Sequence, residues 1–179
     1  MGIHTMQNEL ILVDQFDTIL GYGTHSLVHQ GAGLLHRAIS VFIINQHDKV
    51  LLQQRSVKKL LWPLVWSNSC CGHPYRGENY LEAAERRVWE ELHLRPTLRH
   101  LFTFSYKATY QNIGSECEIC AVFIGCSNCV PEPNPVEIED LCFIESSLLT
   151  KYLRTNQNFF SPWLYLEWAI IIERGYLQP

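Results

Sequence analysis

The sequence predicts an α/β fold, in which a mixed β-sheet is flanked by helices within a single domain. The chain has 179 residues, 47% of them hydrophobic and 12% aromatic, which is enough for one domain with a buried core. Strand-like and helix-like segments alternate along it, and no internal repeat divides it. We therefore take residues 1–179 as one domain, with a flexible N-terminus over residues 1–9.

Short apolar segments predict the strands of the first half. Residues 10–13 form the first of them. Residues 38–44 and 50–54 flank a polar turn at residues 45–49, which predicts a hairpin. Residues 66–69 are a further candidate strand.

A helix is predicted to begin after Asn79 and to end before Pro96. Asparagine is a favoured N-cap residue, and a proline just beyond the last turn marks the end of a helix. Apolar residues recur between them at helical spacing, on a stripe that we expect to face the core: Leu81, Ala84, Val88 and Leu92.

The second half is predicted to contain a long hairpin, one more strand and two helices. Residues 98–108 and 116–125 pair around a turn at residues 110–115. The proline-rich segment 131–135 is a stiff loop rather than a domain linker, because the chain beyond it is too short to bury its own core. The last elements are a strand at 136–144 and helices at 146–153 and 162–174.

Composition argues against several classes of partner. The net charge of −4 disfavours nucleic acid or an acidic membrane surface as the main partner. The most apolar run, residues 163–172, is shorter than the roughly 18 residues that span a bilayer, and it contains Glu167. The first residues lack the basic and apolar regions of a signal peptide, so we expect a cytoplasmic location.

Seven cysteines, an odd number without secretory context, are expected to be free thiols. Two Cys-x2-Cys pairs, Cys117/Cys120 and Cys126/Cys129, superficially resemble a zinc site. Only five residues separate the pairs, whereas such sites usually have about 15 or more. The first pair also lies in a predicted strand, where alternation sends its members to opposite faces. A zinc ribbon is therefore the minor alternative.

The predicted helix carries two carboxylates, Glu90 and Glu91, in its last turn. The helix dipole disfavours negative charge there by a few tenths to about 1 kcal/mol. Pairing with Arg86 and Arg87 is one explanation, but such pairs contribute only about 0.2 to 0.5 kcal/mol. A divalent cation facing a carboxylate offsets the cost better, so we favour a functional role for this turn.

Three histidines and two glutamates form a second group: His29, His36, His73, Glu116 and Glu118. Taken singly, each has an ordinary structural explanation, such as a loop histidine or a solvated strand edge. Glu116 and Glu118 are two apart on a predicted strand and so point the same way. If the fold brings the five together, they make an octahedral site of nitrogen and oxygen ligands.

The segment from Gly72 through the helix resembles a Nudix box, the diphosphate-handling motif. Its pattern is Gly72-x5-Glu78-x7-Arg86-x-Val88-x-Glu90-Glu91. Two positions depart from the motif, because Arg87 stands where a glutamate is expected and His93 where a glycine is expected. The missing glutamate indicates a metal and diphosphate cradle without hydrolytic chemistry.

Further motifs extend the resemblance over residues 10–172. They are His29-x6-His36, Ser67-Asn68-Ser69-Cys70-Cys71-Gly72-His73-Pro74, Arg86-Arg87-x3-Glu91-Leu92, Tyr106-Lys107-Ala108-Thr109, Glu116-x-Glu118 and Phe160-Ser161-Pro162-Trp163. In this order they resemble the type 1 isopentenyl-diphosphate delta-isomerases. The resemblance implies a Nudix-like fold and the interconversion of isopentenyl and dimethylallyl diphosphates, with a small-molecule diphosphate as partner.

The resemblance also implies two metal ions. One divalent metal, Mn²⁺ or Zn²⁺, would be held by His29, His36, His73, Glu116 and Glu118. Because neutral imidazoles and ionised carboxylates are required, metal affinity should fall with acid. A Mg²⁺ ion that bridges to the diphosphate would be held by Glu91 and the backbone carbonyl of Cys71.

Basic residues are implied for the diphosphate itself: Arg55, Lys59 and Arg87. Guanidinium groups suit phosphate oxygens through paired hydrogen bonds. His25 stands where relatives carry a lysine, so we expect substrate affinity to depend on pH near neutrality.

The implied chemistry assigns proton transfer to Cys71 and Glu118. Moving a double bond requires adding a proton at one carbon and removing one from another, with water excluded. Tyr106 would assist Glu118, and the ring of Trp163 would stabilise a carbocation by about 2 kcal/mol or more when desolvated. For Trp163, core packing is the alternative. Cys70 is expected to point away and to have no catalytic role.

Two other functions remain as alternatives. A Nudix-type diphosphate hydrolase would bind metal and diphosphate at the same residues, but Cys71 would then have no catalytic role. A metal-stabilised interaction module without activity is the third possibility. For the isomerase we expect a monomer or a weak homodimer.

Overall fold

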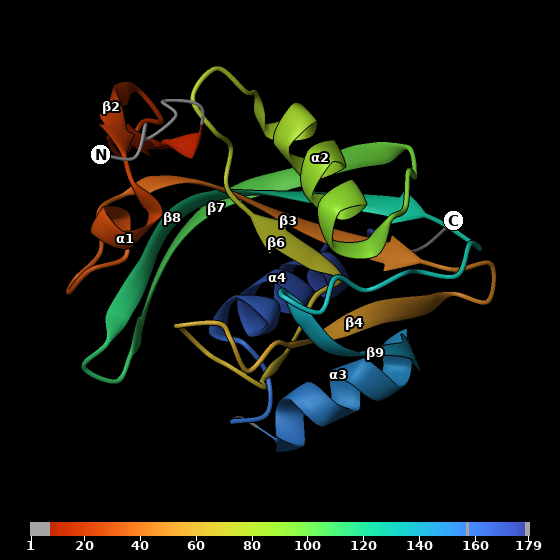
Figure 1. The fold of residues 1–179 in the computed structure, drawn as a ribbon. Helices are drawn as coiled ribbons and strands as arrows, with labels where there is room; N and C mark the ends of the chain where they lie inside the picture. The colour runs from red at the N-terminus through yellow and green to blue at the C-terminus, as the bar shows by residue number, and fades with distance from the viewer. Residues whose placement is uncertain (1–7, 157, 178–179) are drawn as a thin grey trace.

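The computed structural model describes residues 8–156 and 158–177, and in this part of the chain it forms one nine-stranded sheet with helices on both faces (Figure 1). The N-terminal residues expected to be flexible lie largely outside the described residues. The elements are β1 (Leu10–Val13), β2 (Ile19–Gly23), α1 (His25–Val28), β3 (His36–Ile44), β4 (Lys49–Arg55), β5 (Trp66–Ser67), β6 (Cys70–Gly72), α2 (Tyr80–Leu92), β7 (Leu98–Tyr110), β8 (Gly114–Cys126), β9 (Ile138–Glu145), α3 (Ser146–Thr155) and α4 (Pro162–Glu173).

The sheet is mixed, as predicted, and β3 is its central strand. Strand β8 pairs with β3 in parallel along the whole of β3, whereas β1, β4 and β6 pair with it antiparallel. The predicted long hairpin is confirmed as β7 and β8, with a turn shorter than expected. Strand β9 joins the sheet through β4.

Alternation along β3 divides the core into two layers. Ile39, Val41 and Ile43 pack with the buried face of α2. Phe42 and Ile44 pack on the opposite side, with α4 and α3. Since successive side chains of a strand point to opposite faces, one strand supplies both cores and fixes α2 and α4 on opposite sides of the sheet.

Helix α2 begins where the sequence predicts. Asn79 accepts a hydrogen bond from the Glu82 backbone N–H, and the Glu82 carboxylate accepts one from the Asn79 N–H, which completes a capping box. Leu81 was expected on the buried stripe, but it is 40% exposed, and Ala83 is buried in its place. In the first turn of α2 the buried face is therefore rotated from the predicted stripe.

The end of α2 explains one departure from the Nudix box. His93 follows the helix in the left-handed conformation, with φ of 53°, which a glycine adopts without steric cost. In this chain His93 Nδ1 lies 3.1 Å from the carbonyl oxygen of Glu132. This contact ties the helix end to the proline-rich loop.

Three short elements were missed by the sequence patterns. Strand β2 contains two glycines, and helix α1 has only four residues, so neither shows a readable periodicity. Strand β6, three residues long, pairs with residues 39–41 of β3. The strand predicted at 66–69 is confirmed over its first two residues as β5.

In the described part of the chain, no helix combines the length and the apolar character needed to cross a membrane.

We expect Asn79→Ala to lower the free energy of unfolding by about 1 kcal/mol, because it removes the side chain that caps α2. Denaturant unfolding measures the change, and Asn79→Ser, which keeps a capping oxygen, is the control. A stability of the alanine variant equal to that of the parent would show that the capping box contributes nothing.

Candidate functional site

A cavity of about 470 Å³ opens on the α4 side of the sheet, beside β3, β6 and β8. Alternation explains why it lies there. Ser40 on β3 is opposite Cys71 on β6 and Val122 on β8, and it shares its face with Phe42 of the α4 core. Strands on both edges of β3 therefore contribute side chains to one cavity.

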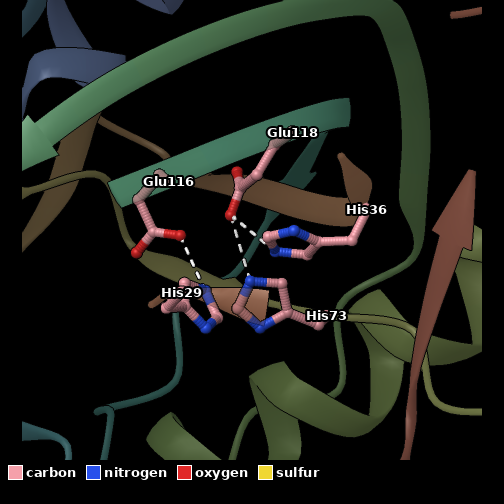
Figure 2. Close-up of side chains that lie close together, drawn as sticks. All are labelled: His29, His36, His73, Glu116 and Glu118. Carbon is pink, nitrogen blue, oxygen red and sulfur yellow. Dashed lines mark hydrogen bonds and ion pairs between the residues drawn. The ribbon is translucent and has the colours of Figure 1, made fainter. Parts of the chain in front are cut away.

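Figure 2 shows the side chains of the five predicted metal ligands converging on one point. His29, His73, Glu116 and Glu118 also line the cavity. His29 follows α1, His36 begins β3, His73 follows β6, and both glutamates belong to β8. Their ligand atoms all lie within 4.8 Å of one another. Most of them are buried, although far apart in the sequence.

Hydrogen bonds fix which ring nitrogen of two histidines faces the cluster. The Nδ1 atoms of His29 and His36 lie 2.7 Å from the carbonyl oxygens of His25 and Leu34. A carbonyl only accepts, so each Nδ1 carries the proton and donates it. In the neutral ring, Nε2 then keeps its lone pair, which is the arrangement of a metal-binding histidine.

Three of the facing atoms lack a hydrogen-bond partner among the described residues. His29 Nε2 and Glu116 Oε2 are 2.8 Å apart, yet among the described residues neither has a hydrogen bond of acceptable geometry, and the same holds for His36 Nε2. Glu118 Oε1 lies 3.0 Å from His73 Nε2 and 3.6 Å from His36 Nε2. Buried lone pairs without donors fit a divalent cation.

The electrostatics agree with this assignment for His73 and Glu118. Burial lowers the pKa of His73 well below its usual value, and His36 and His29 lower it further. Burial alone would raise the pKa of Glu118, but its contacts with His36 and Tyr106 outweigh burial and lower it. A neutral imidazole and an ionised carboxylate are the forms that bind a metal. For His29, burial lowers the pKa, but the contact with Glu116 outweighs burial and raises it, so a metal must displace a proton from this ring.

His25 lines the same end of the cavity, with its ring centroid 4.1 Å from that of His29. Burial, followed by the proximity of His29, lowers the pKa of His25 to about 4. The ring is therefore uncharged near pH 7 in the free protein, and the pH dependence of substrate affinity at His25 stays a prediction.

The neighbouring cysteines point to opposite sides of the sheet, as expected for an extended segment. Cys70 is fully buried in the α2 core, whereas Cys71 lines the cavity. The Cys71 thiol donates to Asn68 Oδ1 at 2.9 Å and lies 3.6 Å from Ser40 Oγ. Burial, followed by the nearby Glu167, raises the pKa of Cys71 to about 12, so it is a thiol at neutral pH.

Two aromatic residues of the predicted site also line the cavity. Tyr106 is paired with Glu118 in the β7–β8 register, and burial raises its pKa well above the usual value. Trp163 is 3% exposed and packs with Leu61 and Trp62, so the core-packing alternative holds as well. Its Nε1 donates to Ser67 Oγ and Asn68 Oδ1, which fixes the ring against the cavity.

The predicted phosphate-binding residues also line the cavity. Lys59 Nζ and Arg87 lie 2.6 Å and 3.2 Å from the carboxylate of Glu137. Arg55 is buried, donates to the carbonyls of Leu61 and Trp62, and has its guanidinium carbon 5.2 Å from the Trp163 ring centroid. All three cations line the cavity and form its positive end.

The predicted magnesium ligand Glu91 is buried behind this end rather than on the cavity wall. Arg87 is hydrogen-bonded to it, and Gln53 Nε2 donates to it at 3.1 Å. Arg87 and Arg86 also pair with Glu90, at 2.9 Å and 3.1 Å. The arginine pairing is therefore present in the structure. A metal at Glu91 stays a prediction, and it requires Arg87 to shift.

The four-cysteine zinc alternative is wrong for this fold. Cys120 is buried and lines the cavity, while Cys126 and Cys129 are exposed at the other end of β8 and beyond. All seven cysteines are free. Within the described residues, the histidine and glutamate cluster is the one group of metal-ligand type that lies close together.

Comparisons with known proteins agree with this geometry. The NUDIX domain family matches residues 34–164. An isopentenyl-diphosphate Delta-isomerase from Photorhabdus laumondii is 38% identical over 96% of this chain and 98% of its own length. The chain therefore belongs to the isopentenyl-diphosphate Delta-isomerase family of Nudix-domain proteins. A second family member, from Pectobacterium atrosepticum, is 37% identical over 91% of this chain and 90% of its own length.

Solved structures support the same fold. The crystal structure of a Deinococcus radiodurans protein has a TM-score of 0.74 at 20% identity and covers 90% of this chain and 97% of its own. A MutT protein from Methanosarcina mazei has a TM-score of 0.64 at 17% identity, over 79% of this chain and 95% of its own. At these identities the likeness establishes the fold. Membership of the isomerase family and the buried cluster together indicate a divalent-metal site.

Sequence reasoning missed three residues of this isomerase-family site. Asn68 was part of a quoted motif but had no role, although it holds both Cys71 and Trp163. Glu137 was seen only as part of a predicted strand. Glu167 was noted as a charge inside an apolar run, and that anomaly was the signal that marked it.

Gly114→Ala should weaken binding of Zn²⁺ or Mn²⁺ by about tenfold or more, because outer contacts of metal ligands have effects of that size. A β-carbon at Gly114 would lie 2.5 Å from the backbone oxygen of His29, so this ligand must move. Gly21→Ala is the control, since nothing lies within 4 Å of its added carbon. Equal metal affinities in competition with a chelator would contradict the expected displacement of His29.

Glu137→Gln should flatten the acid dependence of stability. Burial opposes ionisation of Glu137, but Lys59 and Arg87 outweigh it and lower its pKa from 4.5 to about 2. Its contribution to folding is therefore present above pH 4.5 and is lost as the pH falls through about 2. Unfolding free energies between these pH values should fall less in the variant, whereas the exposed Glu139→Gln should follow the parent. Parallel curves for Glu137→Gln and the parent would rule out the ion pairs as the cause.

Proposed function

We propose that this protein interconverts isopentenyl and dimethylallyl diphosphates, the activity for which its relatives are named. The observation that carries the proposal is that Cys71 and Glu118 face the same cavity from different strands. These two residues lie on strands at opposite edges of β3 and face one cavity that Arg55, Lys59 and Arg87 also line. A thiol and a carboxylate on two sides of one shielded space suit proton transfer to and from an alkene.

The chemistry needs no redox cofactor. One residue gives a proton to one carbon of the substrate, and the other removes a proton from a second carbon, so the double bond moves and the proton count is unchanged. In the free protein, Cys71 is the protonated member and Glu118 the ionised one, according to their shifted pKa values. Because the isomerisation is reversible, the two roles exchange with its direction.

Neighbouring residues adjust these two groups. We assign to Tyr106 the role of holding and polarising Glu118, because it is that residue's partner in the strand register. Asn68 accepts from the Cys71 thiol and so orients it. Trp163 presents an aromatic ring to a carbocation, and its buried position helps to exclude water that would trap such a cation.

The metal assignments belong to the same proposal. His29, His36, His73, Glu116 and Glu118 would hold one Mn²⁺ or Zn²⁺, which when bound supplies positive charge that fixes the Glu118 carboxylate. Glu91 and the carbonyl of Cys71 would hold Mg²⁺ together with the substrate diphosphate. Arg55, Lys59, Arg87 and the neutral His25 would contact the diphosphate oxygens, in competition with Glu137.

The remaining assignments concern the setting of the reaction. A small-molecule diphosphate is the partner, and nucleic acid or membrane is not. The proposed location is the cytoplasm, and the proposed oligomeric state is a monomer or a weak homodimer.

Cys71→Ala and Glu118→Gln should each lower isomerase activity by at least about a hundredfold, the range expected for a positioned acid or base. Cys70→Ala should keep most of the activity, because that thiol lies in the α2 core. The measurement is the rate of dimethylallyl diphosphate formation by folded variants. Equal losses for Cys70→Ala and Cys71→Ala would remove the basis of the assignment.

Proton exchange in heavy water tests the function itself. With isopentenyl diphosphate, Mg²⁺ and either Mn²⁺ or Zn²⁺, the protein should incorporate deuterium into the allylic product without releasing phosphate. Phosphate release without allylic product would instead identify a Nudix-type hydrolase and overturn the proposal.

A further inference from the structure

Glu167 is a fully buried carboxyl in the wall of the cavity, and neither the proton-transfer pair nor the metal clusters use it. It lies on α4, where most neighbours are apolar and where Trp163 precedes it by one helical turn. Residues four apart share a helix face, and both side chains line the cavity. The carboxyl group is therefore placed beside the ring proposed to face a carbocation.

The contacts of Glu167 are incomplete. The Cys120 thiol donates to Oε1 at 3.8 Å, while Oε2 has no hydrogen-bond partner among the described residues. Burial raises the pKa of Glu167 to about 8, so the carboxyl is mostly neutral at pH 7. A buried polar atom without a partner destabilises a fold. Such an atom can gain a partner when a ligand enters the cavity.

The positive charge beside the cavity disfavours a carbocation there, so a further source of negative potential would help to stabilise one. The guanidinium of Arg55 lies 5.2 Å from the Trp163 ring centroid, and its positive charge opposes a cation in the same space. The neutral alkene gains little from an unpartnered oxygen, whereas a cation gains much. An interaction that strengthens only as charge develops lowers the barrier of a reaction.

We propose that the free carboxyl oxygen of Glu167 stabilises positive charge on the hydrocarbon part of the bound diphosphate, together with the ring of Trp163. The inference rests on the proposed isomerase function and adds a binding residue to it. A neutral carboxyl acts here through its oxygen dipole. A glutamine keeps such an oxygen, whereas a methionine of similar length does not.

Binding of two diphosphate esters tests the proposal. Dimethylaminoethyl diphosphate carries a protonated nitrogen where the carbocation would form, and isopentyl diphosphate has nearly the same shape without that charge. Calorimetry in Mg²⁺ gives the ratio of their affinities for the parent, Glu167→Gln and Glu167→Met. The exposed Glu173→Met on the same helix is the matched control.

We expect Glu167→Met to lower the preference for the cationic ester by about tenfold or more, while Glu167→Gln and Glu173→Met keep most of it. The methionine variant should also unfold at a higher temperature than the parent, because a buried polar group without a partner is gone. A merely structural role would not change the ratio of affinities.

An unchanged ratio in a folded Glu167→Met protein overturns the inference, as does an equal loss in the glutamine and methionine variants. Neither outcome touches the isomerase proposal if the parent protein still incorporates deuterium into the allylic product. Absence of that turnover in the parent would instead overturn the proposed function.

Discussion

The parallel pairing of β3 with β8 is the constraint on which the site depends. It sets His36 opposite Glu118, and the antiparallel pairing of β6 on the other edge of β3 sets Cys71 opposite Ser40. A slip of either register by one residue would turn the paired side chains to the opposite face of the sheet. Glu118 would then enter the α2 core, and Cys70 would replace Cys71 in the cavity.

The same geometry separates two kinds of chemistry within one cavity. At one end, three histidines and two glutamates converge, and three of their atoms lack a hydrogen-bond partner among the described residues: His29 Nε2, His36 Nε2 and Glu116 Oε2. At the other end, Lys59 and Arg87 both pair with Glu137. Burial then keeps Cys71 protonated, while its contacts keep Glu118 ionised. Burying these polar groups destabilises the fold, but it also holds each of them in a defined protonation state.

Local sequence patterns predicted much of the fold. The cap at Asn79, the core positions Val88 and Leu92 and the long hairpin follow from helix capping and periodicity, which are local properties. Leu81 was placed wrongly because only one side of the first turn of α2 packs on the sheet. Ala83, not Leu81, lies on that side. Strand β6 is too short to be read without its partner.

The sequence predicted which residues form the site, but it did not predict the contacts between them. The spacing of His29, His36 and His73 gives no distance, and only the pairing of strands brings them together. The low pKa of His25 and the high pKa of Cys71 arise from burial, which composition does not reveal. Glu137 and Glu167 had no motif, and they become visible only through the cations and the cavity beside them.

X-ray absorption spectroscopy of the protein loaded with one equivalent of Zn²⁺ tests the central claim most directly. That claim is that the five clustered ligands hold one metal and leave Cys71 as a free thiol. It predicts a first shell of nitrogen and oxygen at about 2.0 to 2.2 Å, with imidazole scattering. A sulfur shell near about 2.3 Å would contradict it, because a cysteine would then be a ligand.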